Sequence, residues 1–209
     1  MSLQVPFGAI AQGIRDAVAA RRVRRLLAGM PRTPLGELPE DTPGRVTGIA
    51  RPLAKRVLEA PLSGRLCVYY AIVVDAVRAK RYKHLASEQD AVAFLLDDHG
   101  HHAVVDPTAA RVSSAFDEVV RITGDTAPTA RAAAILARHR LLDGNWRFFT
   151  EVRLREAVIE VDEAITILGA GTREPDRDRA AEYRDGATRL RLTGSPRFPL
   201  VISDDTRSL

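Results

Sequence analysis

The segment that most constrains the fold is RLCVYYAIVVDAV, residues 65–77, which is almost free of polar side chains. In an extended chain, successive side chains point to opposite faces. Both faces of this segment are then apolar, one with Val68, Tyr70, Ile72 and Val74 and the other with Cys67, Tyr69, Ala71 and Val73. A short run of this kind is typical of a strand buried on both sides.

Further strand patterns follow it, whereas only one internal segment has a clear helical pattern. Residues 91–107 predict a hairpin that turns at Asp98-His99-Gly100, and residues 126–142 predict a helix capped by Thr129 and stopped at 143–145. The other predicted strands are residues 44–50, 115–123, 148–171 (one of them ending at 169–171), 188–194 and 198–204. The chain is therefore expected to have a β-dominated α+β fold with mixed or antiparallel, barrel-like sheets, one internal helix and an N-terminal helix.

The N-terminal helix is predicted over residues 7–31 and ends at Gly29 and Pro31. Its apolar residues do not share one face, so either the helix breaks near Arg21 or each half packs against a different surface. Its arginines also suggest contact with an anionic membrane surface as a hypothesis. The residues of this hypothesis are Arg15, Arg21, Arg22, Arg24 and Arg25.

These patterns divide the 209 residues into three parts. Residues 1–31 form the basic helix, residues 32–205 a β-rich domain, and residues 206–209 a tail. At the start of the domain, the Pro- and Gly-rich segment 31–44 is either a linker or an extended wrap.

Composition excludes several classes of protein. The 31 basic and 27 acidic residues nearly balance, and aromatic residues make up only 5% of the chain, so no nucleic-acid partner is expected. Cys67 is the only cysteine, which excludes an internal disulfide and zinc sites built from cysteine pairs. The longest uncharged apolar run, residues 66–74, is too short to span a membrane, and no export signal is present, so a cytoplasmic location is expected.

No catalytic, metal or cofactor site emerges from the motifs. His101 and His102 are adjacent in the hairpin and would point to opposite faces, so the histidines and acids there indicate a polar turn rather than a metal site. Cys67 lies in an apolar strand, where burial would raise the pKa of the thiol and leave it structural. The glycines at 169–171 lack the third glycine and the helix of a dinucleotide-binding loop.

Several motifs occur in the order found in the GIDE-type domain, also called the beside-a-membrane (BAM) domain. They are the G-x-V-x-G strand at 44–48, the turn Ala60-Pro61-Leu62-Ser63-Gly64, the run Cys67-Val68-Tyr69-Tyr70, Phe94 with Asp97 and Gly100, and Val105-Asp106-Pro107. Residues 148–171 and 198–204 are similar to later strands of that domain. The chain thus resembles the GIDE-type domain over residues 32–205.

The resemblance carries only some of the family's properties. GIDE-type domains occur in the MULAN family of membrane-anchored RING ubiquitin ligases and in bacterial relatives. With one cysteine and five histidines this chain cannot form a RING, and the arginine-rich helix stands where the family has a membrane span. The Pro-Gly-Asp turn expected within residues 155–164 is also missing.

The resemblance therefore implies a non-catalytic binding or sensing domain for a peptide, a small ligand or a partner protein, without a cofactor. The alternative is a component of a ubiquitin-like modification pathway, a ubiquitin transferase by family association alone. A tyrosine hydroxyl in the 65–77 strand needs a partner and could mark a pocket rim, although a turn followed by core residues is the simpler interpretation. The binding residues implied by the family motif are Pro61, Ser63, Gly64, Cys67, Tyr69, Tyr70, Asp97, Gly100 and Asp106.

Overall fold

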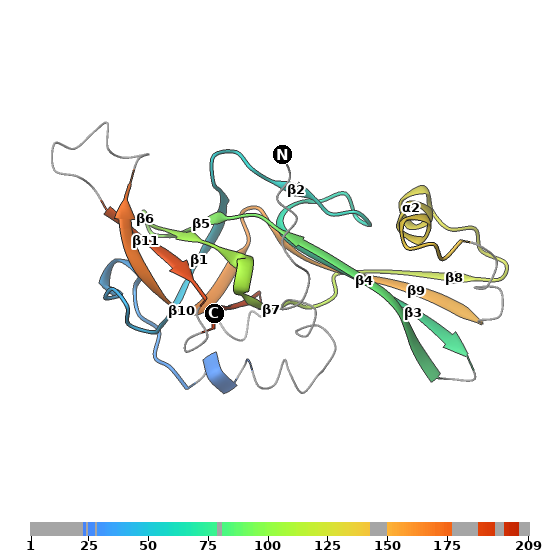
Figure 1. Cartoon of the computed structure of the whole chain (residues 1–209), viewed down its shortest axis with the longest axis horizontal. Helices are drawn as coiled ribbons and strands as arrows, with labels where there is room; N and C mark the ends of the chain where they lie inside the picture. The colour runs from blue at the N-terminus through green and yellow to red at the C-terminus, as the bar shows by residue number, and fades with distance from the viewer. Residues whose placement is uncertain are drawn as a thin grey trace.

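The computed structural model describes residues 23, 25–27, 29–78, 81–142, 150–176, 188–194 and 199–204. Two sheets follow one another along the long axis of the molecule, and helix α2 lies beside the second of them (Figure 1). The first sheet contains β1 (Gly44–Pro52), β5 (Phe94–Asp98), β6 (His101–Val105), β7 (Arg111–Ser113), β10 (Ala164–Pro175), β11 (Thr188–Thr193) and β12 (Val201–Ser203). The second contains β2 (Leu58–Glu59), β3 (Leu66–Arg78), β4 (Arg81–Ala91), β8 (Glu118–Thr123) and β9 (Glu151–Glu160).

The first sheet closes into a barrel. Its strands pair in the order β1–β5–β6–β11–β10, and β10 also pairs with β1, which completes the ring. The pairs β11–β6 and β12–β7 are parallel and the others in this sheet are antiparallel. The interior is filled by large apolar side chains that include Phe94, Leu96, Ile165, Ile167 and Leu192. The expected β-dominated, barrel-like α+β fold is confirmed.

The second sheet is open and is built around β3. Strand β9 pairs with one edge of β3, β4 and β2 pair along the other, and β8 lies outside β9. Helix α2 (Ala130–Arg138) covers one face of this sheet. Ile135 and Leu136 of the helix pack with Ile72, Val74 and Leu154 in a second core.

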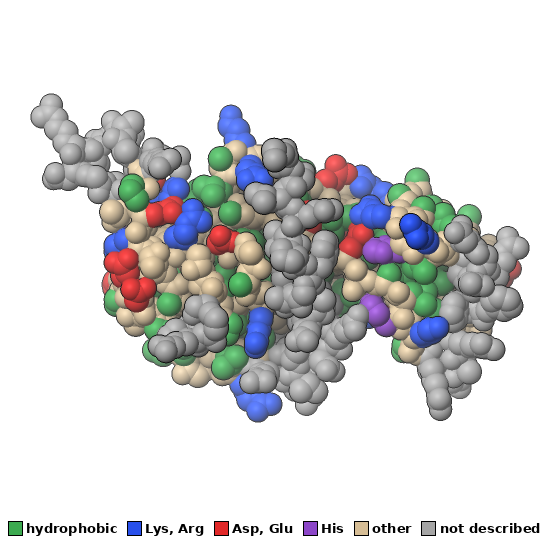
Figure 2. Space-filling model, viewed as in Figure 1, with side chains coloured by type: hydrophobic (Ala, Val, Ile, Leu, Met, Phe, Trp, Pro, Cys, Tyr) green, Lys and Arg blue, Asp and Glu red, His purple; other side chains and the backbone are tan. Residues whose placement is uncertain are grey.

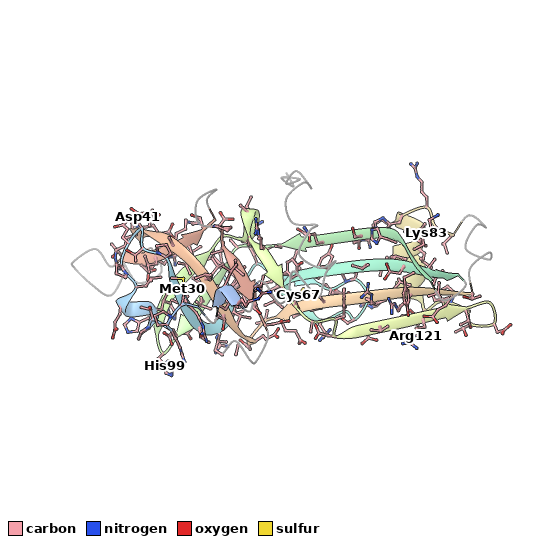
Figure 3. All side chains as sticks on the ribbon, turned by 90° about the horizontal axis from the view of Figure 1, so that it is seen from below. Met30, Asp41, Cys67, Lys83, His99 and Arg121 are labelled. Atoms are coloured by element: carbon pink, nitrogen blue, oxygen red, sulfur yellow. The ribbon has the colours of Figure 1, made fainter. Side chains whose placement is uncertain are left out.

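Strand β3 contributes to both cores, which explains its two apolar faces. Its register against β9 shifts between Cys67 and Tyr69. Val68 and Tyr69 therefore both enter the barrel core, whereas Ile72 packs under α2. Cys67 lies where the barrel meets the open sheet (Figure 3). The predicted doubly buried strand is confirmed.

The hairpin predicted for residues 91–107 is confirmed as β5 and β6, with Asp98 paired to His101. His99 and Gly100 both have positive φ, 52° and 86°, as a two-residue type I′ turn requires. Strand β8 confirms the prediction for residues 115–123. Strands β4 and β7 were not predicted, and they show no apolar alternation because each is an edge strand or a very short one.

The predicted strand end at residues 169–171 is wrong, because β10 continues to Pro175. A Cβ atom on Gly171 would lie 2.8 Å from the carbonyl oxygen of Arg191, and one on Gly169 would lie 2.6 Å from the Leu200 side chain. These glycines allow neighbouring chain segments to approach closely.

Helix α2 begins as predicted but ends earlier. The Thr129 hydroxyl accepts a hydrogen bond from the Ala132 N–H at 3.3 Å, so the predicted cap is confirmed. The helix ends at Arg138 instead of residue 142, because Arg140 adopts a left-handed φ of 56° and the Leu141 N–H returns to the Leu136 carbonyl. This is a Schellman ending with arginine where glycine is usual. The predicted stop at 143–145 lies outside the described residues.

The described part of the N-terminal region packs on the barrel side. Leu27 is helical and buried, and Arg25 is exposed. Arg15, Arg21, Arg22 and Arg24 lie outside the described residues, so membrane contact stays a prediction. Segment 31–44 is an extended wrap in which Leu35 of the short helix η1 (Leu35–Glu37) and Leu38 are buried.

We expect Thr129→Ala to destabilise the protein by about 1 kcal/mol, because the Ala132 N–H loses its acceptor. Thr129→Ser keeps an acceptor and should cost much less. Urea unfolding of both variants measures the difference, and equal stabilities would contradict the capping role.

Candidate functional site

A fully buried carboxylate fixes the turn of residues 60–64. Glu156 of β9 is 0% exposed, and its two oxygens accept the backbone N–H groups of Leu62 at 2.7 Å and Ser63 at 2.9 Å. Buried carboxylates are tolerated when their oxygens are satisfied in this way. The turn is therefore held against the sheet at a defined position.

A surface groove of about 620 Å³ lies between this turn and α2. Its lining comes from β2, the turn, β3 and α2 and combines apolar, tyrosine and charged side chains: Glu59, Pro61, Tyr70, Ala130, Arg131, Ala134 and Arg138. Basic, acidic and histidine side chains gather beside α2 on the face shown in Figure 2. The groove is the candidate functional site.

Arg131 forms one end of the groove. Its guanidinium lies directly over Gly64, where a Cβ atom would be 2.7 Å from Nη2, and Gly64 has a φ of +80°. Nη2 donates to Glu59 Oε1 at 2.7 Å. Glycine at position 64 thus serves both the turn and the close approach of Arg131.

Arg138 and Tyr70 form the other end. Arg138 donates to Glu88 Oε1 at 2.7 Å, and His139 Nε2 lies 2.9 Å from Glu88 Oε2. Burial, together with the charges of Glu88 and Asp90, raises the pKa of Tyr70 to about 12. The Tyr70 hydroxyl therefore stays protonated, and it forms no hydrogen bond within the part of the chain that the structure describes.

The structure brings together some of the residues expected from the family motif. Pro61 and Tyr70 line the groove, and Ser63 and Gly64 belong to the turn that bounds it. Cys67 is fully buried beside it, and burial raises the pKa of its thiol to about 12, as expected for a structural cysteine.

Four of the expected residues lie elsewhere. Tyr69 is buried in the barrel core, and its hydroxyl is 3.5 Å from Gln89 Oε1. Asp97 accepts the Gly100 N–H at 3.0 Å within the hairpin turn. Asp106 accepts the Thr108 N–H at 3.1 Å and caps the short helix η2 (Pro107–Ala109). These residues hold the barrel together and do not reach the groove.

No three His, Cys, Asp or Glu side chains among the described residues are placed to hold a metal ion. At the expected polar turn, the buried Asp98 accepts the Leu35 N–H at 2.9 Å and lies 2.9 Å from His99 Nδ1. His102 lies 3.4 Å from Asp97, and His101 packs over Gly36 instead.

A cluster of carboxyl groups lies where the two sheets join. Burial, together with the charges of Asp204 and Asp117, raises the pKa of Glu163 to about 7. Burial and Asp117 raise the pKa of Asp204 to about 6, although the Ser114 hydroxyl donates to Asp204 and opposes this rise. Glu163 lies between β9 and β10, Asp117 directly before β8 and Asp204 directly after β12, so their ionisation changes the charge at the junction of the sheets.

The face of the open sheet opposite α2 is also charged, but its charged groups form ion pairs with one another. Asp75 accepts Arg155 at 2.6 Å and Arg153 at 3.3 Å. These guanidiniums stack 4.2 Å from the ring centres of Phe116 and Tyr82. The network stabilises this face and leaves the groove as the better candidate site.

The sequence interpretation missed Glu59, Arg131, Arg138 and Glu156. Glu156 had a detectable signal, because it is a charged residue between Leu154 and Val158 on the same face of a predicted strand. The two arginines lie seven residues apart on one helix, but only the fold places the 60–64 turn beside them.

Comparisons of the chain with protein-family models, with curated proteins and with solved structures find no match. In the described part of the chain, no helix is both long enough and apolar enough to cross a membrane.

We expect Glu156→Gln to lower the free energy of unfolding by about 2–3 kcal/mol, because the amide's N–H₂ group would face a backbone N–H. Glu118→Gln is the matched control, since Glu118 pairs with Glu156 on the neighbouring strand and its side chain forms no hydrogen bond in the described structure. Chemical denaturation and amide exchange at Leu62 and Ser63 measure the effect. Equal stabilities of the two variants would refute the anchoring role.

We expect the free energy of unfolding to fall as pH rises from 5 to 8. The folded-state pKa of Glu163, about 7, lies above its ordinary value of 4.5, so the folded protein binds more protons in this range. The stabilising contribution of proton binding at Glu163 is complete below about pH 4 and is lost as pH rises through 7.

Glu163→Gln should therefore raise stability at pH 8 by about 1 kcal/mol, a value reduced for solvent screening, and should have little effect at pH 5. Denaturation at both pH values is the measurement. The exposed Glu37→Gln variant is the control, and an unchanged pH slope in Glu163→Gln would contradict the assignment.

Proposed function

We propose that this chain is a non-catalytic binding domain whose ligand lies in the α2 groove. The observation that carries the proposal is the groove itself, which combines guanidinium and hydroxyl donors with small apolar side chains in its lining. Ligand sites in proteins likewise combine apolar contact surface with a few oriented polar groups.

The chemistry of the groove favours binding over catalysis. Arginine keeps its proton at physiological pH and cannot act as a base. The Tyr70 hydroxyl, with a pKa of about 12, also stays protonated. Cys67, the nearest thiol, is buried and has a raised pKa, so it is a poor nucleophile. The groups that face the groove can therefore donate hydrogen bonds and pair with charges, but they form no nucleophile–base pair.

The resemblance to the GIDE-type domain supports the same proposal, because Pro61, Gly64 and Tyr70 belong to its most specific motif and lie at the groove. A peptide or a small ligand would fit the groove's dimensions. The ubiquitin-pathway alternative stays a hypothesis drawn from the resemblance alone.

A matched pair of alanines on α2 tests the proposal. Both side chains are exposed, but Ala134 lines the groove, whereas Ala137 is not among the residues that line it. A library of small fragments and random short peptides would be screened against the ¹⁵N-labelled protein by NMR. We expect hits to shift the amides of residues 59–64 and 130–138, and Ala134→Trp to abolish their binding while Ala137→Trp retains it. Hits that bind equally well to the Ala134→Trp variant, or the absence of any hit, would overturn the proposal.

A further inference from the structure

Arg131 has donor capacity that its one ion pair does not use. Nη2 donates to Glu59, but Nε and Nη1 have no hydrogen-bond partner among the described residues. The Arg131 side chain is 48% exposed and the Glu59 side chain 57%. Exposed pairs of this kind are weak, because water competes for both partners. Glu59 is therefore an exchangeable partner.

Arg138 differs although it lies on the same helix. Its partner Glu88 is only 11% exposed and is also bound by His139 at 2.9 Å. A carboxylate with two partners and little solvent contact does not exchange readily. The charge of Arg138 is thus matched within the fold, and the Arg131 end is the part of the groove that can accept an anion.

The groove's length suggests the size of its occupant. Arg131 and Arg138 are seven residues apart, which corresponds to about 10 Å along the helix axis. An extended peptide advances about 3.3 Å per residue, so three residues span this distance. Ala134 lies on the helix between the two arginines, and Pro61 and Ala130 add further apolar surface to the lining.

We propose that the groove binds the last three residues of a peptide in extended form, with the terminal carboxylate on Arg131. This inference rests on the binding function proposed above. The carboxylate displaces Glu59 and meets the guanidinium fork in the bidentate geometry that arginine favours. At the other end, the Tyr70 hydroxyl donates to a peptide carbonyl.

A carboxylate fits better than a phosphate group for two reasons. Arg131 already binds a carboxylate, Glu59, so one is accommodated at this position. Only one guanidinium in the groove has an exchangeable partner, and its single charge matches a carboxylate rather than a phosphate dianion.

Pooled N-acetyl tripeptides, prepared as free acids and as C-terminal amides, test the inference by NMR titration of the full chain. We expect the acids to bind at least about tenfold more tightly than the amides, as the loss of a charge-assisted hydrogen bond implies. Inorganic phosphate at equal ionic strength should not displace them.

Three variants locate the carboxylate. Arg131→Gln should abolish the difference between acid and amide, and Glu59→Gln should tighten acid binding about threefold without changing amide binding, because a competing carboxylate is removed. Arg121→Gln is the control, since Arg121 is a 66% exposed arginine on β8 outside the groove.

Equal binding of acids and amides in the groove would overturn this inference and leave the proposed function standing. Displacement by phosphate, or weaker acid binding in Glu59→Gln, would also overturn it. If neither tripeptides nor the broader library bind, both proposals fail.

Discussion

The hydrogen bonds that Glu156 accepts from Leu62 and Ser63 connect the middle of β9 to the turn that precedes β3. Glu156 is completely buried, and a carboxylate in that position is stable only while its oxygens are satisfied. The turn cannot leave the sheet without leaving this charge unpaired in an apolar surrounding. One buried group therefore determines where Pro61 and Gly64 lie, and with them one wall of the groove.

The rest of the groove, formed by Tyr70 and α2, depends on the contribution of β3 to both cores. The register shift between Cys67 and Tyr69 brings Val68 and Tyr69 into the barrel core together, and Tyr70, on the opposite face of the strand from Tyr69, faces the groove. Helix α2 is held over the same strand by Ile135 and Leu136. Its groove side carries Ala130 and Ala134, so space remains above Tyr70 that larger side chains would fill.

Local patterns in the sequence predicted β3, the hairpin at His99-Gly100 and the Thr129 cap, because each depends on residues close together in the chain. Features that depend on distant partners were not predicted. Gly171 permits the approach of Arg191 instead of ending a strand, and Arg140 takes a conformation that usually indicates glycine. The site follows the same division: the family motif indicated Pro61 and Tyr70, whereas Arg131 acquires its place only when the turn and the helix meet.

The groove has a direction because chemically identical groups at its two ends have different surroundings. Arg138 pairs with Glu88, which is nearly buried and has a second partner, whereas Arg131 pairs with the exposed Glu59. Arg131 lies over Gly64 only because no Cβ atom occupies that space, and Gly64 is placed there by the turn that Glu156 anchors. The buried carboxylate thus positions, through two backbone N–H groups and one glycine, the guanidinium that remains free to exchange its partner.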